Sequence, residues 1–426
     1  MKLLVIAYEF PPSPSPQSLR WMYLSRELAR LGHEVHVLTA DIPVGTVSLA
    51  CPDGVVVHRS FAGPVRGLLA WLARRKQMPP MAAAANQADA VPISPQPSRL
   101  NWKGRLVERF QRVANWVLFP DLRGEWKWSA KRSLRTLLDQ VRPDIVISSH
   151  EPATTLELAL AVRGGNAKWV ADIADPVLAA YTPRRWHWRS WRLEAATWKK
   201  ADLLLLTNEH AAELLAGRHG QRRQPWRIVP QGFDDALPAP MDGRHKSRPK
   251  VEFLYTGSFY QFRAPDEFLH AVAMVPGVRL SIASRTVPAV VEQFAAKHPE
   301  QIRLLGFLDH RQVLQAQRKA DILVNIANAD ATQVPGKFNE YLGAARPVLH
   351  VAADKGQDMI AAFLARTGRG WAVENDREKI AGQLSVLVSA RGEVNFGATI
   401  NPADAAAYGW RQIACELSSA MQDLLR

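Results

Sequence analysis

The 426-residue sequence predicts an α/β fold made of two doubly wound, Rossmann-like domains. Short runs rich in Val, Ile and Leu alternate with amphipathic helical patterns, which is typical of parallel sheets covered by crossover helices. The alternation occurs twice, and a polar, proline-rich stretch at 233–250 separates the two series. A chain of this length with 47% hydrophobic residues exceeds what one core usually supports, so two domains are expected.

In the first series, seven apolar, β-branched runs are predicted to be strands. These runs are 2–8, 34–40, 55–59, 144–149, 168–174, 202–208 and 227–232. An amphipathic helix is predicted at 18–32, ending at Gly32. Residues 79–98 are low in complexity and are predicted to be a mobile insert in this domain.

The second series repeats the pattern with six predicted strands. These are 251–258, 278–284, 302–307, 321–327, 346–352 and 370–375. We therefore expect an N-terminal domain at 1–232, a linker at 233–250 and a C-terminal domain at 251–402. Ligands of such sheets bind outside the carboxyl ends of the strands, so we expect the two domains to face a shared cleft.

Composition narrows the possible partners and compartment. The formal net charge is +14, from 54 Lys and Arg against 40 Asp and Glu. This charge favours anionic partners such as nucleotides, anionic membrane or nucleic acid, and does not choose among them. The two cysteines, Cys51 and Cys415, have no metal-binding or redox spacing, so a reducing cytoplasm is expected. The amino-terminal apolar run is short and breaks at proline, and no later run is long enough to span a bilayer. We expect a cytoplasmic protein that is neither exported nor membrane-spanning.

Several nucleotide-binding motifs are missing from the sequence. The turn after the first strand reads EFPPSPSPQ, without the glycines of a dinucleotide fingerprint, and no P-loop motif occurs. No D-x-D pair is present, so no metal site and no metal-bridged diphosphate are expected. A bound diphosphate would then be neutralised by cationic side chains and helix amino termini.

The stretch VPGKFNEYLGAARPVLHV, at 334–351, combines a cation and a carboxylate on one helical face. Lys337 and Glu340 are three residues apart, after a proline and a glycine that suit a helix start. The pair could offer a cation to phosphate and a carboxylate to a hydroxyl pair. It could also be a surface ion pair worth about 0.2–0.5 kcal/mol.

This segment resembles the K-x-x-E-Y-L signature of family 4 glycosyltransferases with the GT-B fold, particularly those of bacterial surface-polysaccharide synthesis. The resemblance covers nearly the whole chain. GHEVHVLT at 32–39 is similar to the family's amino-terminal region, although its loop carries Ser15, Pro16 and Gln17 in place of a glycine pair. RIVPQGFDD resembles the entry to the interdomain linker. Residues 403–426 resemble the terminal helix that packs back on the first domain.

The resemblance implies a donor site in the second domain for a nucleotide sugar, with a UDP-sugar favoured and no further cofactor. Glu340 would hold the ribose, and Lys337 with Arg263 would hold the diphosphate. Gly257 would allow close approach of the backbone, beside Ser258, which replaces a family arginine. Gly306, Phe307 and Leu308 match the loop that frames the nucleobase. Gly257 could be a plain turn, Phe307 core, and Arg263 a solvated charge.

In the first domain the resemblance implies candidate catalytic residues. His150, in H-E-P after a strand, would contact the donor sugar, although a histidine there is often only a structural hydrogen-bonding group. Asp172 and Asp175 match a D-x-x-D-P segment, where one carboxylate could orient or deprotonate an acceptor hydroxyl. Capping or loop hydrogen bonds explain them equally well. Thr332 stands where the family has the first glutamate of an E-x7-E pair.

Tryptophans are interleaved with cations in three segments. Arg99–Arg135 holds ten Lys/Arg, and 66–76 is similarly amphipathic. A stripe on a predicted helix comprises Trp188, Trp191, Ala195 and Trp198. Such faces suit an anionic bilayer surface; inward-packed tryptophans with solvated charges are the other interpretation. The chain shows no nucleic-acid recognition module, so no nucleic-acid partner is expected.

The predicted function is therefore transfer of a sugar from a nucleotide diphosphate sugar to a hydroxyl of a lipid-linked or membrane-associated glycan. The family implies retention at the anomeric carbon, and the missing D-x-D pair predicts metal independence. A peripheral location on the inner face of the cell membrane fits this function. Two alternatives remain open: a nucleotide-sugar epimerase of the same fold, and an inactive scaffold at the membrane, as Thr332 and Ser258 suggest.

Overall fold

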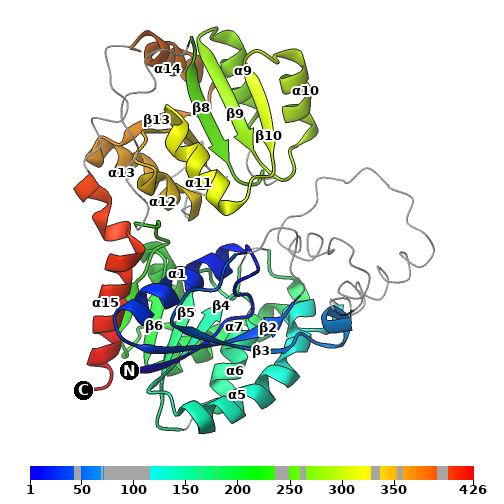
Figure 1. Ribbon diagram of the computed structural model, residues 1–426, viewed down its shortest axis with the longest axis vertical. Coiled ribbons are helices and arrows are strands. Elements are labelled where there is room, and N and C mark those ends of the chain that lie inside the picture. Colours follow the sequence, from blue (N-terminus) through cyan, green and yellow to red (C-terminus); the bar gives the residue numbers. More distant parts are fainter. Residues whose placement is uncertain are drawn as a thin grey trace, which may run out of the picture. The chain divides into compact units, whose positions relative to one another are not determined.

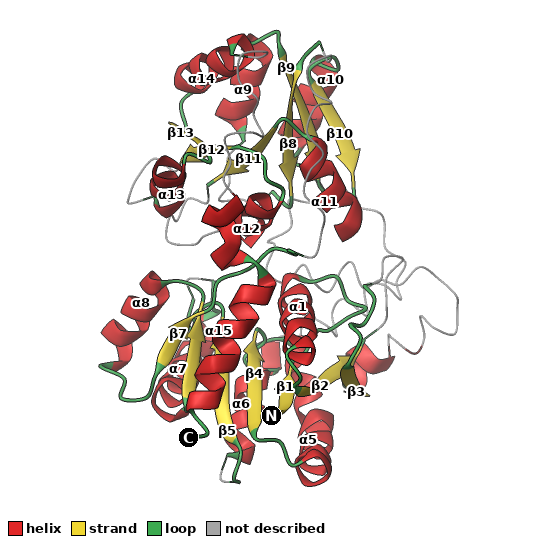
Figure 2. Ribbon diagram, turned by 60° about the vertical axis from the view of Figure 1, so that its left-hand side comes forward, coloured by secondary structure: helices red, strands yellow, loops and turns green. Residues whose placement is uncertain are grey.

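The computed structural model describes residues 1–42, 49–68, 71, 116–163, 165–179, 181–235, 249–259, 265–327, 336–352, 358–390 and 402–426. The chain divides into two compact units. Unit 1 contains the described residues up to Gln231 together with Trp410–Arg426, and unit 2 contains Gly232–Gly409. Figures 1 and 2 together label their α-helices and strands.

Unit 1 contains a seven-stranded sheet in which every pair of neighbours is parallel, in the order β3-β2-β1-β4-β5-β6-β7. Its strands are β1 Lys2–Ile6, β2 Glu34–Asp41, β3 Val55–Phe61, β4 Ile145–His150, β5 Lys168–Ile173, β6 Leu203–Leu206 and β7 Trp226–Ile228. Each overlaps one of the predicted runs. The central strands β1, β4, β5 and β6 are buried on both faces, which is why they appear in the sequence as largely apolar stretches.

Helices cover both faces of this sheet. They are α1 Pro16–Arg30, α5 Lys127–Val141, α6 Thr154–Val162, α7 His187–Lys200, α8 Glu209–His219 and α15 Trp410–Asp423, with 3-10 turns η2 Leu122–Trp126 and η3 Arg184–Trp186. The start of α1 follows from its sequence: Ser15 Oγ accepts a hydrogen bond from the Ser18 amide at 3.1 Å, and Pro16 occupies the first turn. Gly32 then adopts φ +85°, which ends the helix as predicted.

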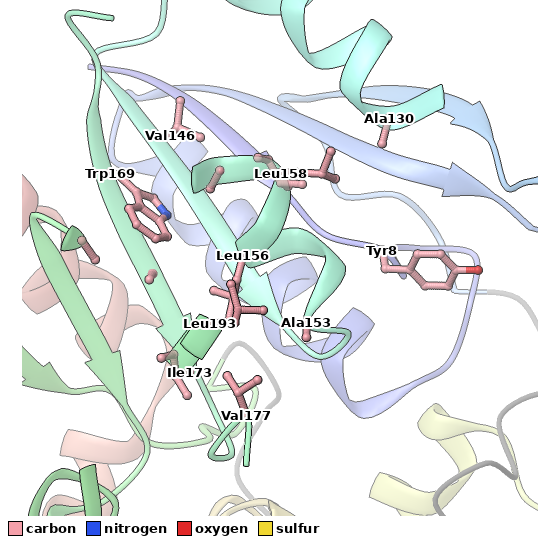
Figure 3. Close-up of a cluster of buried hydrophobic side chains, with 14 of the residues drawn as sticks. Tyr8, Ala130, Val146, Ala153, Leu156, Leu158, Trp169, Ile173, Val177 and Leu193 are labelled. Atoms are coloured by element: carbon pink, nitrogen blue, oxygen red, sulfur yellow. The ribbon is translucent and has the colours of Figure 1, made fainter. Parts of the chain in front are cut away.

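Two cores fill the spaces on either side of the sheet. One packs α5, α6, α7 and α8 against alternate strand residues, and Figure 3 shows Leu156 and Leu158 of α6 beside Trp169 and Ile173 of β5. The other packs α1 and α15 against the opposite face. These two helices lie side by side in Figure 2, with the rings of Tyr23 and Trp410 stacked at 5.8 Å. The C-terminal helix thus returns to the first domain, as the sequence predicts.

Unit 2 repeats the architecture with a six-stranded parallel sheet, in the order β10-β9-β8-β11-β12-β13. Its strands are β8 Val251–Thr256, β9 Val278–Ala283, β10 Ile302–Gly306, β11 Ile322–Ile326, β12 Val348–Ala352 and β13 Gly370–Glu374. Its helices are α9 Asp266–Met274, α10 Ala289–Lys297, α11 His310–Lys319, α12 Gly336–Gly343, α13 Met359–Thr367 and α14 Arg377–Ser389, with the 3-10 turn η4 Pro402–Tyr408. The two parallel sheets confirm the predicted fold class.

A buried ion pair connects α1 to the centre of the first sheet. Arg20 on α1 donates two hydrogen bonds, each 2.9 Å long, to the two carboxylate oxygens of Asp172 on β5. The Trp21 indole donates a third, at 2.8 Å. Arg20 also donates to the carbonyls of Val229 and Pro230, both at 2.9 Å, so one guanidinium holds three segments together. Both charged side chains are almost completely buried.

Removing one partner of this pair leaves a charge without compensation in the core. We expect Arg20→Met to lower the free energy of unfolding of unit 1 by about 3–5 kcal/mol. Urea unfolding followed by tryptophan fluorescence would measure this, since thirteen of the fourteen tryptophans belong to unit 1. Lys2→Met, which breaks a half-exposed pair with Glu34, serves as the control and should change stability by at most about 1 kcal/mol. If both substitutions lower the free energy of unfolding by equally small amounts, the buried pair of Arg20 and Asp172 does not stabilise unit 1 as stated.

Candidate active site

The strand order of each sheet reverses at one point, where ligand sites of open parallel sheets form. In unit 1 the reversal lies between β1 and β4, and in unit 2 between β8 and β11. The residues that follow the carboxyl ends of these strands are therefore the candidates for chemistry. We call the candidate residues at the reversal point of one unit the half-site of that unit.

His150 is the last residue of β4 and lies at the reversal point of unit 1. Its side chain is buried, with the residue 4% exposed, and neither ring nitrogen has a hydrogen-bond partner in the described structure. Burial, reinforced by the nearby Arg123 guanidinium, lowers the pKa of His150 from 6.5 to about 4. The imidazole is therefore neutral at pH 7 and retains one donor and one acceptor nitrogen.

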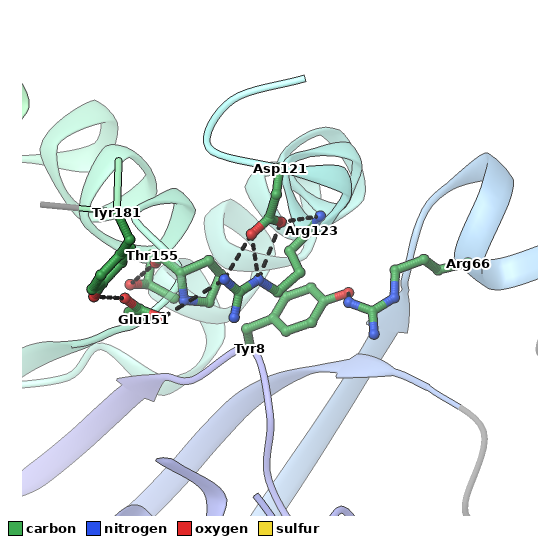
Figure 4. A network of polar contacts seen from close by, with 8 residues as sticks. Tyr8, Arg66, Asp121, Arg123, Glu151, Thr155 and Tyr181 are labelled. Atoms are coloured by element: carbon green, nitrogen blue, oxygen red, sulfur yellow. Dashed lines mark hydrogen bonds and ion pairs between the residues drawn. The ribbon is translucent and has the colours of Figure 1, made fainter. Parts of the chain in front are cut away.

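A polar network surrounds the end of β1 at the same edge. The Tyr8 hydroxyl accepts a 2.7 Å hydrogen bond from Arg66, and burial raises the pKa of Tyr8. Arg123 donates to both carboxylate oxygens of Asp121, at 2.6–3.1 Å. These residues lie around the Tyr8 ring in Figure 4.

Glu151 extends this network toward the loop after β5. One of its oxygens lies 3.7 Å from Arg123, and another accepts a 3.0 Å hydrogen bond from the Tyr181 hydroxyl (Figure 4). Tyr181 is itself exposed. The half-site of unit 1 thus combines a neutral imidazole, a buried phenol and two arginines that are partly balanced by carboxylates. Such a set can hydrogen-bond sugar hydroxyls without carrying a large net charge.

The structure gives Asp172 a structural role in place of the predicted catalytic one. Its carboxylate is completely buried, and its oxygens accept hydrogen bonds from Arg20 and Trp21. Because this carboxylate is buried and both of its oxygens are already engaged, a substrate hydroxyl cannot reach it. Asp175 follows β5 by two residues and is half-buried at the carboxyl edge of the sheet. Of the two aspartates, only Asp175 lies where a substrate could reach it.

In unit 2, Lys337 lies on the first turn of α12, against the end of β8. Its ammonium nitrogen is 3.7 Å from the centroid of the Tyr255 ring, a cation–π contact. Its side chain also lies 3.5 Å from the position that a Cβ would take at Gly257. Gly257 has φ +108°, which side chains rarely adopt, so this position favours glycine for conformational reasons. Ser258 follows and is exposed, and its carbonyl accepts a hydrogen bond from Tyr255.

Glu340 lies one helical turn after Lys337 on α12. Burial raises the pKa of its carboxyl, opposed by His310, whose ring nitrogen lies 3.8 Å away, and by a hydrogen bond from Gln317. The adjacent Tyr341 is fully buried, and its hydroxyl contacts Thr256 at the end of β8. The helix is thereby fixed with Lys337 and Glu340 beside that strand.

The remaining predicted donor residues fall at the end of β10 or outside the described residues. Gly306 has φ +67°, and Phe307 is exposed instead of belonging to the core. The Arg285 guanidinium lies 4.6 Å from the Phe307 ring centroid, and Leu308 is half-buried. Arg263 and Thr332 lie outside the described residues.

Sequence reasoning missed several residues that the structure brings to the unit 1 half-site. They are Tyr8, Arg66, Asp121, Arg123 and Glu151. Arg66 and Arg123 belong to segments that the sequence suggested were basic surface, and nothing in their spacing shows that they meet near β1. Only two positions could have indicated them: Tyr8 is the last residue of one predicted strand, and Glu151 follows another by two residues.

The buried imidazole makes a pH-dependent contribution to stability that can be measured. Because the unfolded histidine binds a proton below about pH 6.5 and the folded one only near pH 4, stability should fall as pH falls through this window. The loss should be on the order of 3 kcal/mol by the usual conversion of pKa shifts. Unfolding free energies of wild type and His150→Gln, compared from pH 7 to pH 4, would show it. A difference between the two proteins that stays constant over this range would contradict a neutral His150.

Comparisons with known proteins agree with this architecture. Residues 81–237 match the family model described as Glycosyltransferase Family 4. No match was found among curated proteins.

Three solved structures illustrate the likeness in fold. WaaG, a glycosyltransferase involved in lipopolysaccharide biosynthesis, is 14% identical, with 99% of this chain and 96% of WaaG covered and a TM-score of 0.54. The E. coli trehalose-6-phosphate structure bound with UDP-2-fluoro glucose is 12% identical, with 99% of both chains covered and a TM-score of 0.60. A Listeria monocytogenes protein assigned as a UDP-N-acetylglucosamine 2-epimerase is 14% identical, with 100% and 96% covered and a TM-score of 0.52.

At these identities the neighbours show the fold alone. The two parallel sheets give the chain the GT-B-type fold of these neighbours, and the match to Glycosyltransferase Family 4 covers residues 81–237 of the 426.

Proposed function

We propose that this chain is a family 4 glycosyltransferase that moves a sugar from a nucleotide diphosphate sugar, with UDP as the favoured nucleotide, to a hydroxyl of a lipid-linked or membrane-associated glycan. The observation that carries the donor assignment is Lys337, whose buried ammonium lies beside Gly257 at the reversal point of the second sheet. A cation next to an open glycine turn is suited to a diphosphate. UDP-2-fluoro glucose is bound in one structural neighbour, which supports a nucleotide-sugar donor.

Each half-site has a distinct part in the proposed reaction. Departure of the nucleoside diphosphate leaves negative charge on its oxygens, and Lys337 stabilises that charge as it develops. Glu340, one turn along the same helix, accepts hydrogen bonds from the ribose hydroxyls. Neutral His150 in unit 1 hydrogen-bonds a hydroxyl of the transferred sugar, and Asp175 orients the acceptor. Lys337 neutralises part of the negative charge of the diphosphate. Among the described residues there is no group of three or more side chains that could hold a metal ion.

The acceptor, the stereochemistry and the location are further parts of the proposal. Retention at the anomeric carbon and a polysaccharide or glycolipid product follow from the family likeness. Within the described part of the chain, no helix is long and apolar enough to cross a bilayer. A peripheral position on the inner face of the membrane would bring a lipid-linked acceptor to the enzyme.

The donor site can be tested by nucleotide binding. We expect Lys337→Ala to weaken UDP binding about 10- to 100-fold, since hydrogen bonds to charged groups contribute about 1.5–3 kcal/mol. Glu340→Ala should weaken UDP binding and have no comparable effect on inorganic diphosphate, because its partner is the ribose. Calorimetry with UDP and diphosphate, with and without EDTA, would measure both effects. Lys297→Ala, which removes an exposed cation from α10 of the same unit, is the matched control.

Two outcomes would overturn parts of this assignment. Unchanged UDP affinity in the Lys337→Ala, Glu340→Ala double variant would show that the donor does not bind there. Turnover of the nucleotide sugar without any acceptor would favour the epimerase alternative, which has a neighbour of the same fold.

A further inference from the structure

Exposed aromatic side chains gather where α5 and α7 begin in unit 1. Among the described residues of these segments, Trp128 is 84% exposed, Trp188 68% and Trp116 65%, and Val117 is also exposed. Other tryptophans of the same segments are buried, namely Trp126 and Trp198. Large exposed apolar side chains that cluster are typical of an interaction surface.

A shared carboxylate holds the two helix starts together. Glu157 on α6 accepts a 2.7 Å hydrogen bond from Lys127, the first residue of α5, and a 2.6 Å bond from Arg189 on α7. The Phe119 ring packs edge-on against Trp186 at 5.5 Å and lies under the Arg189 guanidinium at 4.2 Å. The segments that carry Trp116, Trp128 and Trp188 are therefore fixed to one another. We call the exposed side chains Trp116, Val117, Trp128 and Trp188 the aromatic rim.

The aromatic rim lies at the same edge of the sheet as the unit 1 half-site. Helix α6 follows the carboxyl end of β4, and Lys127 and Arg189 both reach its first turn, so α5 and α7 start at this edge too. Arg123, four residues before Lys127, belongs to the network of Figure 4 around Tyr8 and Glu151. One short segment thus contributes both to the polar site and to the rim.

The charge around the rim is positive, although Asp121 pairs with Arg123, and Glu157 pairs with Lys127 and Arg189. Residues 116–132 and 184–192 contain eight basic side chains and two acidic ones. The basic residues are Arg123, Lys127, Lys131, Arg132, Arg184, Arg185, Arg189 and Arg192, and the acidic ones are Asp121 and Glu125. Glu125 is buried and accepts hydrogen bonds from the amides of Val65 and Arg66, so it does not offset these cations at the surface. Arg192 lies 4.6 Å from the Trp188 ring centroid, a cation beside an exposed indole.

We propose that the aromatic rim and its cations dock unit 1 on an anionic phospholipid bilayer, with the half-site around His150 next to the lipid surface. Indole rings are favoured in the interfacial region of a bilayer, and basic side chains around them attract anionic headgroups. The docking itself does not depend on the donor chemistry. The role assigned to it, presentation of a lipid-linked acceptor hydroxyl beside His150, rests on the function proposed above.

Vesicle binding by the full chain tests the proposal. Wild-type protein should co-sediment with vesicles of phosphatidylcholine and phosphatidylglycerol, and much less with phosphatidylcholine alone. Trp128→Ala with Trp188→Ala should weaken binding about tenfold or more, from the apolar area withdrawn from the bilayer. Arg185→Gln with Arg192→Gln should weaken it about fivefold per charge at low salt. The control is Trp226→Ala, which removes a 38% exposed tryptophan from β7 and should leave binding unchanged.

The outcomes separate docking from catalysis. Melting temperatures and UDP-induced thermal shifts should match wild type in every variant, which shows that the variants fold and keep the donor site. Absence of binding to anionic vesicles, or equal loss with Trp226→Ala, would overturn the docking surface while leaving the donor assignment intact. The wild-type protein could instead bind DNA and not vesicles, and the Trp128→Ala, Trp188→Ala variant could lose that DNA binding. This result would show that the rim binds nucleic acid and not a bilayer. If UDP causes no thermal shift in the wild-type protein, the donor site is refuted and the docking surface is not affected.

Discussion

The ion pair between Arg20 and Asp172 is the interaction on which the first sheet depends most. Its guanidinium reaches a carboxylate on β5 and the carbonyls of Val229 and Pro230, where the chain leaves β7. Burying two charges is costly, and the cost is offset here because nearly every polar atom of the pair has a partner. Asp172 lies opposite Ser149 in the pairing of β4 with β5, one residue before His150. The same pair therefore helps to hold the strand end that carries the imidazole.

The two half-sites use burial in opposite ways. In unit 1, burial keeps His150 uncharged, so it can donate and accept hydrogen bonds with hydroxyl groups at neutral pH. In unit 2, the Lys337 ammonium rests on the electron-rich face of Tyr255, which compensates part of its desolvation. A neutral group suits a sugar, and a cation suits a diphosphate. The chemistry proposed for the enzyme divides in the same way between its sheets.

Sequence reasoning predicted the sheets well because their signal is local. Each strand overlaps an apolar run in the sequence. The strand order and its reversal points depend on non-local packing, and the runs do not predict them. Side-chain partners are not local: Arg20 and Asp172 are 152 residues apart, and no pattern in either segment indicates their contact. Asp172 was therefore interpreted as a catalytic candidate.

The predicted tryptophan stripe on α7 shows a second limit. Trp198, near the end of α7, packs into the core, whereas Trp188, in its first turn, is exposed. Helical periodicity gives the direction in which a side chain points, but not how far along the helix the neighbouring elements cover it.

The return of α15 to unit 1 has a consequence for biosynthesis. The described residues of unit 2 all lie between Gly232 and Gly409, so they are synthesised before α15. Unit 1 needs Trp410, Ile413, Leu417 and Met421 to close one of its two cores. The domain that begins first along the chain is thus completed last, and until then the face of its sheet that α15 will cover exposes apolar surface that a chaperone could bind.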